Sequence, residues 1–272
     1  MPPASNATDS YIISGGVAGK ARLSVLAEVL RSSTRELLLR LGNLTGKTLL
    51  DVGCGGGHVA FMMGELVGIS GNVTAIDFDG QLITLNQQQA AEAGITNVHF
   101  ETGSAYALSY ENAFDRAYAR FLLSHLQTPE AAIGRMRESL KKDGWIVVED
   151  VQFSGHFSFP ENKAFNQYLD WYAAAARHNN QYPEIGPELP SLLRRAGFTD
   201  VGFDVIQPAF ETGPGKQMAL ITLDRIKDTL QSLGIADATA LAQTTADLQA
   251  FTESGESIIS LPRIFRAWGR KP

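Results

Sequence analysis

The glycine-rich segment from Asp51 to Gly57 constrains the fold of this 272-residue chain more than any other feature. The apolar stretch Thr48-Leu-Leu-Asp-Val52 predicts a short strand, and Gly53-Cys-Gly-Gly-Gly57 follows it directly, before a helical pattern over residues 59–67. Glycine lets the backbone turn sharply and lets a ligand approach the main chain closely. The segment therefore predicts a strand, a tight turn and a helix that together hold a nucleotide-type ligand.

The regions around this turn alternate between strand and helix from about residue 20 to 150. Such alternation is typical of a parallel sheet covered by helices on both faces. After residue 150 the pattern becomes mainly helical, with two late strands. We expect strands at 48–52, 73–77, 97–101, 114–119, 145–150, 201–205 and about 262–268, and helices at 20–41, 59–67, 80–93, 129–143, 160–180, 189–196 and within 215–253.

Charge and composition exclude several classes of partner. The chain has 23 Lys and Arg against 29 Asp and Glu, and its basic residues are scattered, which disfavours binding to nucleic acid. No window approaches the roughly 18 consecutive apolar residues that a membrane helix needs. The start of the chain lacks the pattern of a signal peptide, and Cys54 is the single cysteine. We therefore expect a soluble, cytoplasmic protein that binds neither nucleic acid nor a membrane.

The residues around the turn narrow the choice of ligand. A phosphate-binding loop needs Gly-Lys-Ser/Thr, which is absent here, and His58 stands where a nicotinamide fingerprint has its third glycine. Asp51 would repel a pyrophosphate but attract an ammonium or a sulfonium group. Asp77, at the end of the second strand, has paired lone pairs that suit the two hydroxyls of a ribose.

Further segments follow the turn in a set order. They are Leu49-Leu-Asp-Val-Gly-Cys-Gly-Gly-Gly57, Ala75-Ile-Asp77, Gly103-Ser-Ala105, Phe114-Asp-Arg-Ala-Tyr-Ala-Arg120 and Gly144-Trp-Ile-Val-Val-Glu-Asp150. Over residues 45–150 they resemble the successive motifs of class I S-adenosylmethionine-dependent methyltransferases. The resemblance implies an α/β, Rossmann-like doubly wound sheet of seven mostly parallel strands, in which the late strands form a final antiparallel hairpin. It also implies S-adenosyl-L-methionine as the cofactor.

The resemblance assigns contacts to this cofactor residue by residue. Asp51 and Gly53 would lie beside the methionine moiety. Gly55 would let the cofactor pass the backbone, and Asp77 would bind the ribose. Many relatives have an acid where this chain has Ser104, so we expect a weaker or main-chain contact to the adenine amino group. The remaining expected contacts are Phe78, Ser104 and Ala105 around the adenine, Ala119 and Arg120 at the methionine end, and Tyr11 and Arg22 from an N-terminal helix, with Arg22 facing the methionine carboxylate.

Three further residues are candidates for work on the acceptor. His125 follows the fourth strand and is either a general base or a structural residue before the next helix. His156 follows the fifth strand and is a second candidate base. Asp150 would either orient the acceptor or cap a loop. Metal-dependent relatives carry an Asp-Asn pair after a strand, whereas this chain has Glu149-Asp-Val151, so we expect no metal ion.

These observations predict a methyltransferase that acts on a small, partly apolar molecule at oxygen, nitrogen or carbon. Residues 1–44 would cover the cofactor, and residues 45–272 would form the methyltransferase domain. Helical lid insertions at about 156–196 and 212–256 would enclose the acceptor. Two alternatives stay open: an NAD(P)-dependent oxidoreductase and a non-catalytic S-adenosylmethionine-binding protein. A homodimer is equally left open.

Overall fold

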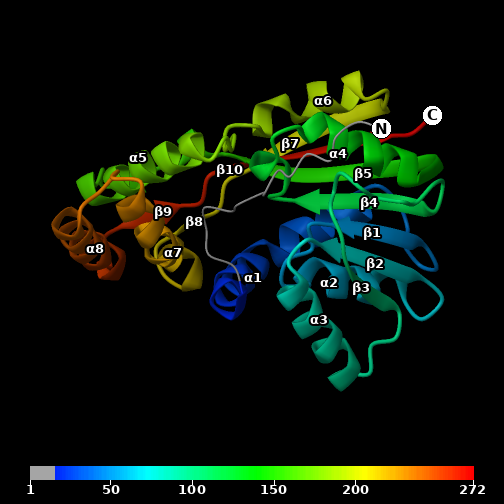
Figure 1. Ribbon diagram of the computed structural model, residues 1–272, viewed down its shortest axis with the longest axis horizontal. Coiled ribbons are helices and arrows are strands. Elements are labelled where there is room, and N and C mark those ends of the chain that lie inside the picture. The colour runs from blue at the N-terminus through cyan, green and yellow to red at the C-terminus, as the bar shows by residue number, and fades with distance from the viewer. Residues whose placement is uncertain (1–15) are drawn as a thin grey trace.

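A seven-stranded sheet forms the centre of the protein (Figure 1). The computed structural model describes the backbone of residues 16–272 and the side chains from residue 22 onward. The strands follow the order β3-β2-β1-β4-β5-β10-β7. Strand β10 is antiparallel to both of its neighbours, whereas β1 to β5 pair in parallel. The strands are β1 (Thr48–Val52), β2 (Asn72–Asp77), β3 (Val98–Thr102), β4 (Phe114–Arg120), β5 (Leu140–Gln152), β7 (Thr199–Ile206) and β10 (Arg263–Arg270).

This topology confirms the predicted Rossmann-like sheet and its late antiparallel pair. Successive side chains of a strand point to opposite faces, so a sheet covered on both sides has two apolar cores. Leu49 and Leu50, neighbours on β1, belong to different cores. Helices α1 (Gly16–Arg40), α2 (His58–Val67) and α3 (Gly80–Glu92) cover the Leu49 face, and α4 (Pro129–Ser139) and α6 (Leu189–Arg195) cover the Leu50 face.

Three helices form a separate region beyond the carboxyl ends of the parallel strands (Figure 1). They are α5 (Lys163–His178), α7 (Met218–Ser232) and α8 (Ala238–Glu253), and they share a third apolar core. A small sheet of β6 (Ser158–Phe159), β9 (Ile258–Ser260) and β8 (Ala209–Phe210) adjoins them. The expected insertions of residues 156–196 and 212–256 therefore supply these helices, although α6 packs on the main sheet.

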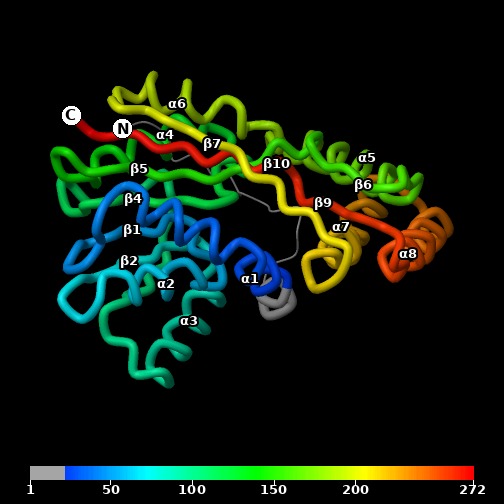
Figure 2. The backbone as a smooth tube through the Cα atoms, turned by 180° about the vertical axis from the view of Figure 1, so that it is seen from behind, coloured from blue at the N-terminus to red at the C-terminus, as the bar shows by residue number. Residues whose placement is uncertain are grey.

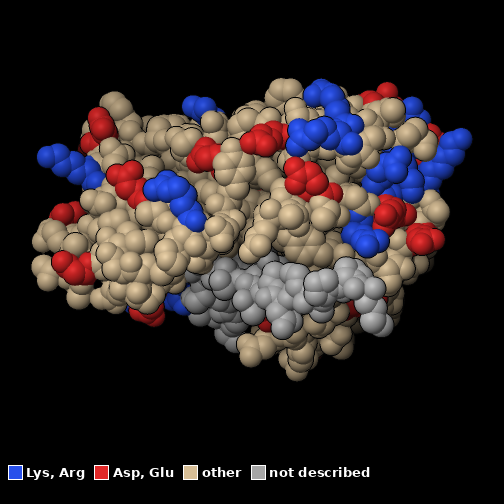
Figure 3. Space-filling view, turned by 45° about the horizontal axis from the view of Figure 1, so that its top comes forward, with Lys and Arg blue, Asp and Glu red and all other residues tan. Residues whose placement is uncertain are grey.

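Helix α1 links the two regions, since it contacts both α2 beside the sheet and α7 in the helical region (Figure 2). Its Leu26 and Leu30 pack with Met218 of α7 and with Ile264 of β10. Acidic and basic side chains are interspersed over the face of the molecule in Figure 3. Within residues 16–272, no helix has the length and apolar character needed to cross a bilayer.

Candidate functional site

The glycine turn after β1 has the backbone geometry that its sequence predicts. Gly53, Gly55 and Gly57 have φ values of +73°, +49° and +76°, a region that favours glycine. The amide groups of Gly53 and Cys54 both donate to the carbonyl oxygen of Ile76, at 2.8 and 3.0 Å, which fixes the turn against β2. A Cβ atom at Gly53 would lie 2.9 Å from Leu122, so the end of that side chain would have to move.

Asp77 holds this turn and faces a cavity at the same time. Its Oδ2 accepts a hydrogen bond from the Gly55 amide at 2.7 Å, and its Oδ1 accepts one from the Asp79 amide at 3.0 Å. An ionised carboxylate has about four acceptor positions, and the backbone amides of Asp79, Gly55 and Phe78 use three of them, so at least one is left for a ligand. Burial raises the pKa of Asp77, and the backbone hydrogen bonds oppose that rise. The geometry suits a ligand that donates a hydrogen bond from a hydroxyl group.

Asp51 is the second carboxylate at the turn, and it is 2% exposed. Among the residues that the structure describes, none donates a hydrogen bond to its buried Oδ2. Burial raises the pKa of Asp51 to about 7, while the positive charge of Arg120 lowers it and the charge of Asp77 raises it. A buried carboxylate with an unused acceptor is stabilised by a bound cation. This orphaned oxygen therefore fits a ligand that carries an ammonium group.

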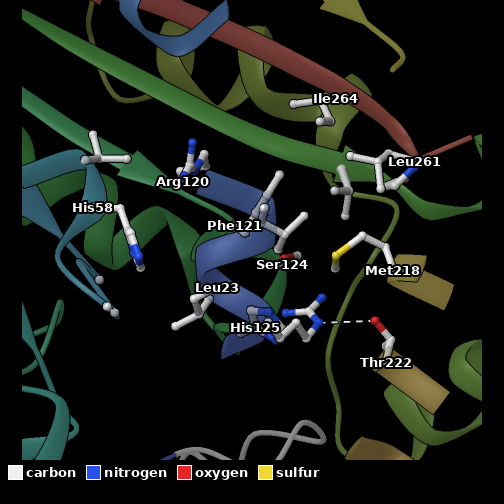
Figure 4. A pocket seen from close by; sticks show the side chains of 18 of the residues that line it. Leu23, His58, Arg120, Phe121, Ser124, His125, Met218, Thr222, Leu261 and Ile264 are labelled. Carbon is white, nitrogen blue, oxygen red and sulfur yellow. Dashed lines mark hydrogen bonds between the residues drawn. The ribbon is translucent and has the colours of Figure 1, made fainter. Parts of the chain in front are cut away.

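Both carboxylates lie at one end of a cavity of about 460 Å³ that reaches from the glycine turn to the helical region (Figure 4). A recess of about 30 Å³ adjoins that end, and Phe78, Ser104 and Ala105 line it. Phe78 is 50% exposed, which leaves an apolar ring beside Asp77 for a flat ligand group. Ala119, by contrast, is buried in the sheet core and lines neither space. Tyr11 lies outside the described residues.

The other end of the cavity is walled by aromatic and apolar side chains. Phe153, directly after β5, stacks on Tyr172 of α5 with ring centroids 4.1 Å apart and an interplanar angle of 16°. Tyr168 from α5, Met218 and Thr222 from α7, and Leu261 before β10 complete this wall. No local sequence pattern marks Met218, Thr222 or Leu261, so their place in this wall could not be predicted from the sequence. We call this end the acceptor chamber, lined by Phe153, His156, Tyr168, Tyr172, Met218 and Thr222.

The structure brings His125 and His156 to this same cavity. Burial lowers the pKa of each imidazole to about 4, and the charge of Arg22 also lowers that of His125, so both rings are neutral at pH 7. Nδ1 of His156 lies 2.8 Å from the carbonyl oxygen of Phe153. Because a carbonyl only accepts, this Nδ1 carries the proton, and Nε2 keeps its lone pair. His156 is therefore oriented to accept a proton or a hydrogen bond through Nε2.

Asp150 lies behind the cavity wall and is 1% exposed. Its Oδ2 accepts from the amide of Ser124 at 3.0 Å and its Oδ1 from the amide of Val151 at 2.9 Å. Burial raises its pKa to about 6, and these backbone hydrogen bonds oppose the rise. Ser124 belongs to the short helix η1 (Leu123–His125), so Asp150 fixes the turn that carries His125.

Two arginines reach the cavity from different directions. Arg120, at the end of β4, donates from its guanidinium to the hydroxyl of Thr34 at 3.1 Å, and its charge acts on Asp51. Arg22, on α1, donates from Nε to the hydroxyl of Thr222 at 3.1 Å. Figure 4 shows Arg120 and His58 at one end of the cavity, and Met218, Thr222 and Leu261 at the other. Within the described part of the chain, no group of acidic, His and Cys side chains could hold a metal ion.

Comparison with known proteins finds similarity to methyltransferases. A family model described as a methyltransferase domain matches residues 44–197. A ubiquinone biosynthesis O-methyltransferase of Hydrogenovibrio crunogenus is 26% identical over 60% of this chain and 66% of its own. A demethylmenaquinone methyltransferase of Lactococcus lactis is 27% identical over 60% of this chain and 70% of its own. The matched segments thus span about two thirds of these relatives.

Among solved structures, a SAM-dependent methyltransferase from Aquifex aeolicus has the same fold. It superposes with a TM-score of 0.53 at 16% identity and covers 92% of this chain and 98% of its own. At this level of identity the likeness concerns the fold alone.

Proposed function

Because this chain belongs to the methyltransferase-domain family and is an S-adenosylmethionine-dependent methyltransferase, we propose that it methylates a small hydroxylated aromatic compound at an oxygen atom. The observation that carries the proposal is one continuous cavity that joins the acid-bordered turn to an aromatic chamber containing a neutral histidine. The family assignment replaces the oxidoreductase alternative. A chamber beside the turn also favours catalysis over cofactor binding alone.

The residues at the turn fit the cofactor group by group. We propose that Asp51 pairs with the ammonium group, for which its Oδ2 has a free acceptor position. Asp77 would receive the ribose hydroxyls beside Gly53 and Gly55. The exposed ring of Phe78 would lie against the adenine, and the recess at Ser104 and Ala105, of about 30 Å³, would take only an edge of it. When bound, S-adenosylmethionine supplies a methyl group on a positively charged sulfur and leaves as S-adenosylhomocysteine.

The acceptor chamber would orient the acceptor and take up the proton that its hydroxyl group loses. Stacked aromatic side chains such as Phe153 and Tyr172 favour a flat ring as the ligand. Holding two reacting groups in line can contribute roughly 7–11 kcal/mol to a reaction barrier. When the acceptor oxygen gains the methyl group, its O–H bond must break, and we propose that Nε2 of His156 takes that proton. The names of two relatives, which concern ubiquinone and demethylmenaquinone, support a ring that carries oxygen atoms.

The other expectations drawn from the sequence are also part of the proposal. Residues 1–44 would cover the cofactor, since Arg22, Leu23 and Leu26 of α1 line the cavity. His125 would be the alternative base, and Asp150 a positioning residue for it. We keep the cytoplasm as the proposed location and a free small molecule, rather than nucleic acid, as the partner, because the chain has one cysteine and a net charge of −6. A homodimer stays an untested option.

A panel experiment tests the proposal. The protein is incubated with S-adenosylmethionine that carries a deuterated methyl group, together with hydroxylated arenes, their amino analogues and ring compounds without either group. We expect deuterated methyl ethers from the hydroxylated arenes only, detected by mass spectrometry. Methylation of the amino analogues alone, or at a ring carbon, would contradict the proposed acceptor atom. Failure to bind S-adenosylhomocysteine in calorimetry would contradict the cofactor assignment itself.

A further inference from the structure

Arg22 lines the cavity and is joined to the acceptor chamber through Thr222. Its Nε donates to Thr222 of α7, the hydrogen bond drawn as a dashed line in Figure 4. Its charge lowers the pKa of His125 and opposes the burial-driven rise in the pKa of Tyr168 and Tyr172. All of these side chains line the cavity. The charge of Arg22 therefore acts on three residues of the chamber and on His125.

The positive charge of Arg22 has no carboxylate partner among the described residues. Arg266 shows the contrast, because its guanidinium pairs with Asp204 at 2.5 Å. Burial lowers the pKa of Arg22, yet a guanidinium stays charged at neutral pH. Arg22 is half-buried, and removing part of a charge from water without a counter-ion is costly. The chamber thus holds a cation that an anionic ligand would stabilise.

The methionine carboxylate of the cofactor is better served by Arg120. The ammonium and carboxylate of an amino acid are attached to one carbon atom, so the cation for the carboxylate must lie beside the anion for the ammonium. The charges that act on Asp51 are those of Arg120 and Asp77. Arg120 is therefore next to the proposed ammonium site, whereas Arg22 is tied to Thr222 on the opposite side of the cavity.

We propose that Arg22 binds an anionic oxygen of the acceptor, a role that rests on the proposed methyltransferase function. This assignment differs from the sequence-based expectation that Arg22 meets the methionine carboxylate. The anionic oxygen is either a carboxylate on the aromatic ring or the ionised hydroxyl that receives the methyl group. Arg22 has four N–H groups besides Nε. They can donate either to the two oxygen atoms of a carboxylate or to the lone pairs of one ionised hydroxyl oxygen. The substrate class is thus an acidic hydroxylated arene.

Binding of matched probes to the complex with S-adenosylhomocysteine tests this assignment. The first pair is 3,4-dihydroxybenzoate and its neutral methyl ester, measured by calorimetry. The second probe is 4-nitrocatechol, whose absorption spectrum reports the ionisation of its hydroxyl. We expect the wild type to bind one anionic form at least tenfold more tightly than its neutral form. Preference for the benzoate identifies a ring carboxylate, and a lowered pKa of bound 4-nitrocatechol identifies the ionised hydroxyl.

Variants then assign the preference to Arg22. Arg22→Met should abolish the preference while the dissociation constant for S-adenosylhomocysteine stays within about threefold of the wild type, which also shows that the variant folds. Thr222→Val, which keeps the charge but removes its hydrogen bond, should reduce the preference partly. Arg225→Met removes a cation of α7 that pairs with Asp224 and does not line the cavity, so it should change neither quantity.

Two results would overturn the assignment without touching the proposed function. One is a wild type that binds S-adenosylhomocysteine but shows no preference for either anionic form. The other is an Arg22→Met variant that keeps the preference and loses tenfold or more in S-adenosylhomocysteine affinity, because Arg22 would then serve the cofactor. A wild type that does not bind S-adenosylhomocysteine would instead contradict the proposed function.

Discussion

The two ends of the cavity are held together by different kinds of contact. At the glycine turn, ligand-facing groups are fixed by backbone hydrogen bonds between neighbouring strands, and Asp77 is only 22 residues from the Gly55 amide that it accepts from. In the acceptor chamber, side chains meet across the whole chain, and Arg22 is 200 residues from Thr222. The turn is thus a local structure that serves a constant ligand, whereas the chamber depends on how distant helices pack. Changes at one end should therefore leave the other largely intact.

The largest expected effect separates chemistry from cofactor binding. Replacing His156 by Gln removes the proposed proton acceptor and should lower kcat about 100-fold or more with the acceptor identified in the panel. The affinity for S-adenosylhomocysteine, measured by calorimetry, should change by less than about threefold. His99→Gln, an exposed histidine on β3, is the matched control and should leave both values unchanged. Full activity of His156→Gln with a loss in His125→Gln would transfer the role of base to His125.

A substitution at the glycine turn should instead change the affinity for the cofactor. Asp77→Ala should weaken binding of S-adenosylhomocysteine at least tenfold, because it removes acceptors for the ribose and for the Gly55 amide. Asp115→Ala is a suitable control, since Asp115 also accepts a backbone hydrogen bond, from Thr48, but does not line the cavity. Unchanged affinity in Asp77→Ala would refute the ribose assignment.

The ionisation of Asp51 gives a pH test of the same end. The free carboxyl has a pKa of about 7, and a bound ammonium favours the ionised form, so binding lowers that pKa. The affinity for S-adenosylhomocysteine should be constant above pH 7 and should fall by up to about tenfold for each pH unit below it. Asp51→Asn should bind more weakly and lose this pH dependence. Burial lowers the pKa of His125 and His156 to about 4, outside the window measured from pH 6 to 8.

Alanine substitutions at two glycines with positive φ should have smaller effects, and they separate backbone strain from contact with the ligand. Gly53 and Gly68 both have positive φ values, +73° and +68°, so alanine at either position should lower the free energy of unfolding by about 1–3 kcal/mol. Only Gly53→Ala should also weaken S-adenosylhomocysteine binding, since a Cβ at Gly68 has open space around it. Urea unfolding and calorimetry give the two quantities. Equal loss of affinity in both variants would mean that strain, and not the turn itself, controls binding.

The sequence predicts the sheet region better than the chamber, for a physical reason. Between residues 45 and 150 the periodic apolar pattern places strands and helices within a few residues of where they lie, because each element buries one defined face. One exception is α4, which we expected to continue to residue 143 but which ends at Ser139. Leu140 instead begins β5, is buried and pairs with Phe114 of β4, while Lys141 pairs with Asp115. Strand pairing there outweighs the helix-favouring lysines.

In the chamber, only residues with chemically distinctive side chains could be chosen from the sequence. His125, His156 and Arg22 stood out for that reason, and all three line the cavity. Thr222 and Met218 have no local signal, because their position depends on how α7 packs against α1 and α5. For Asp150 the sequence left two roles open, because its hydrogen bond from the Ser124 amide forms only when η1 folds against the end of β5.

A crystal structure of the complex with S-adenosylhomocysteine would test the division of the cavity most directly. The account predicts the ribose hydroxyls on Asp77, the amino group on Asp51, the carboxylate beside Arg120, and the sulfur facing the aromatic wall. Arg22 would then remain bonded to Thr222 and free of the cofactor. A carboxylate bound to Arg22, or a nucleoside lying in the aromatic chamber, would contradict the account.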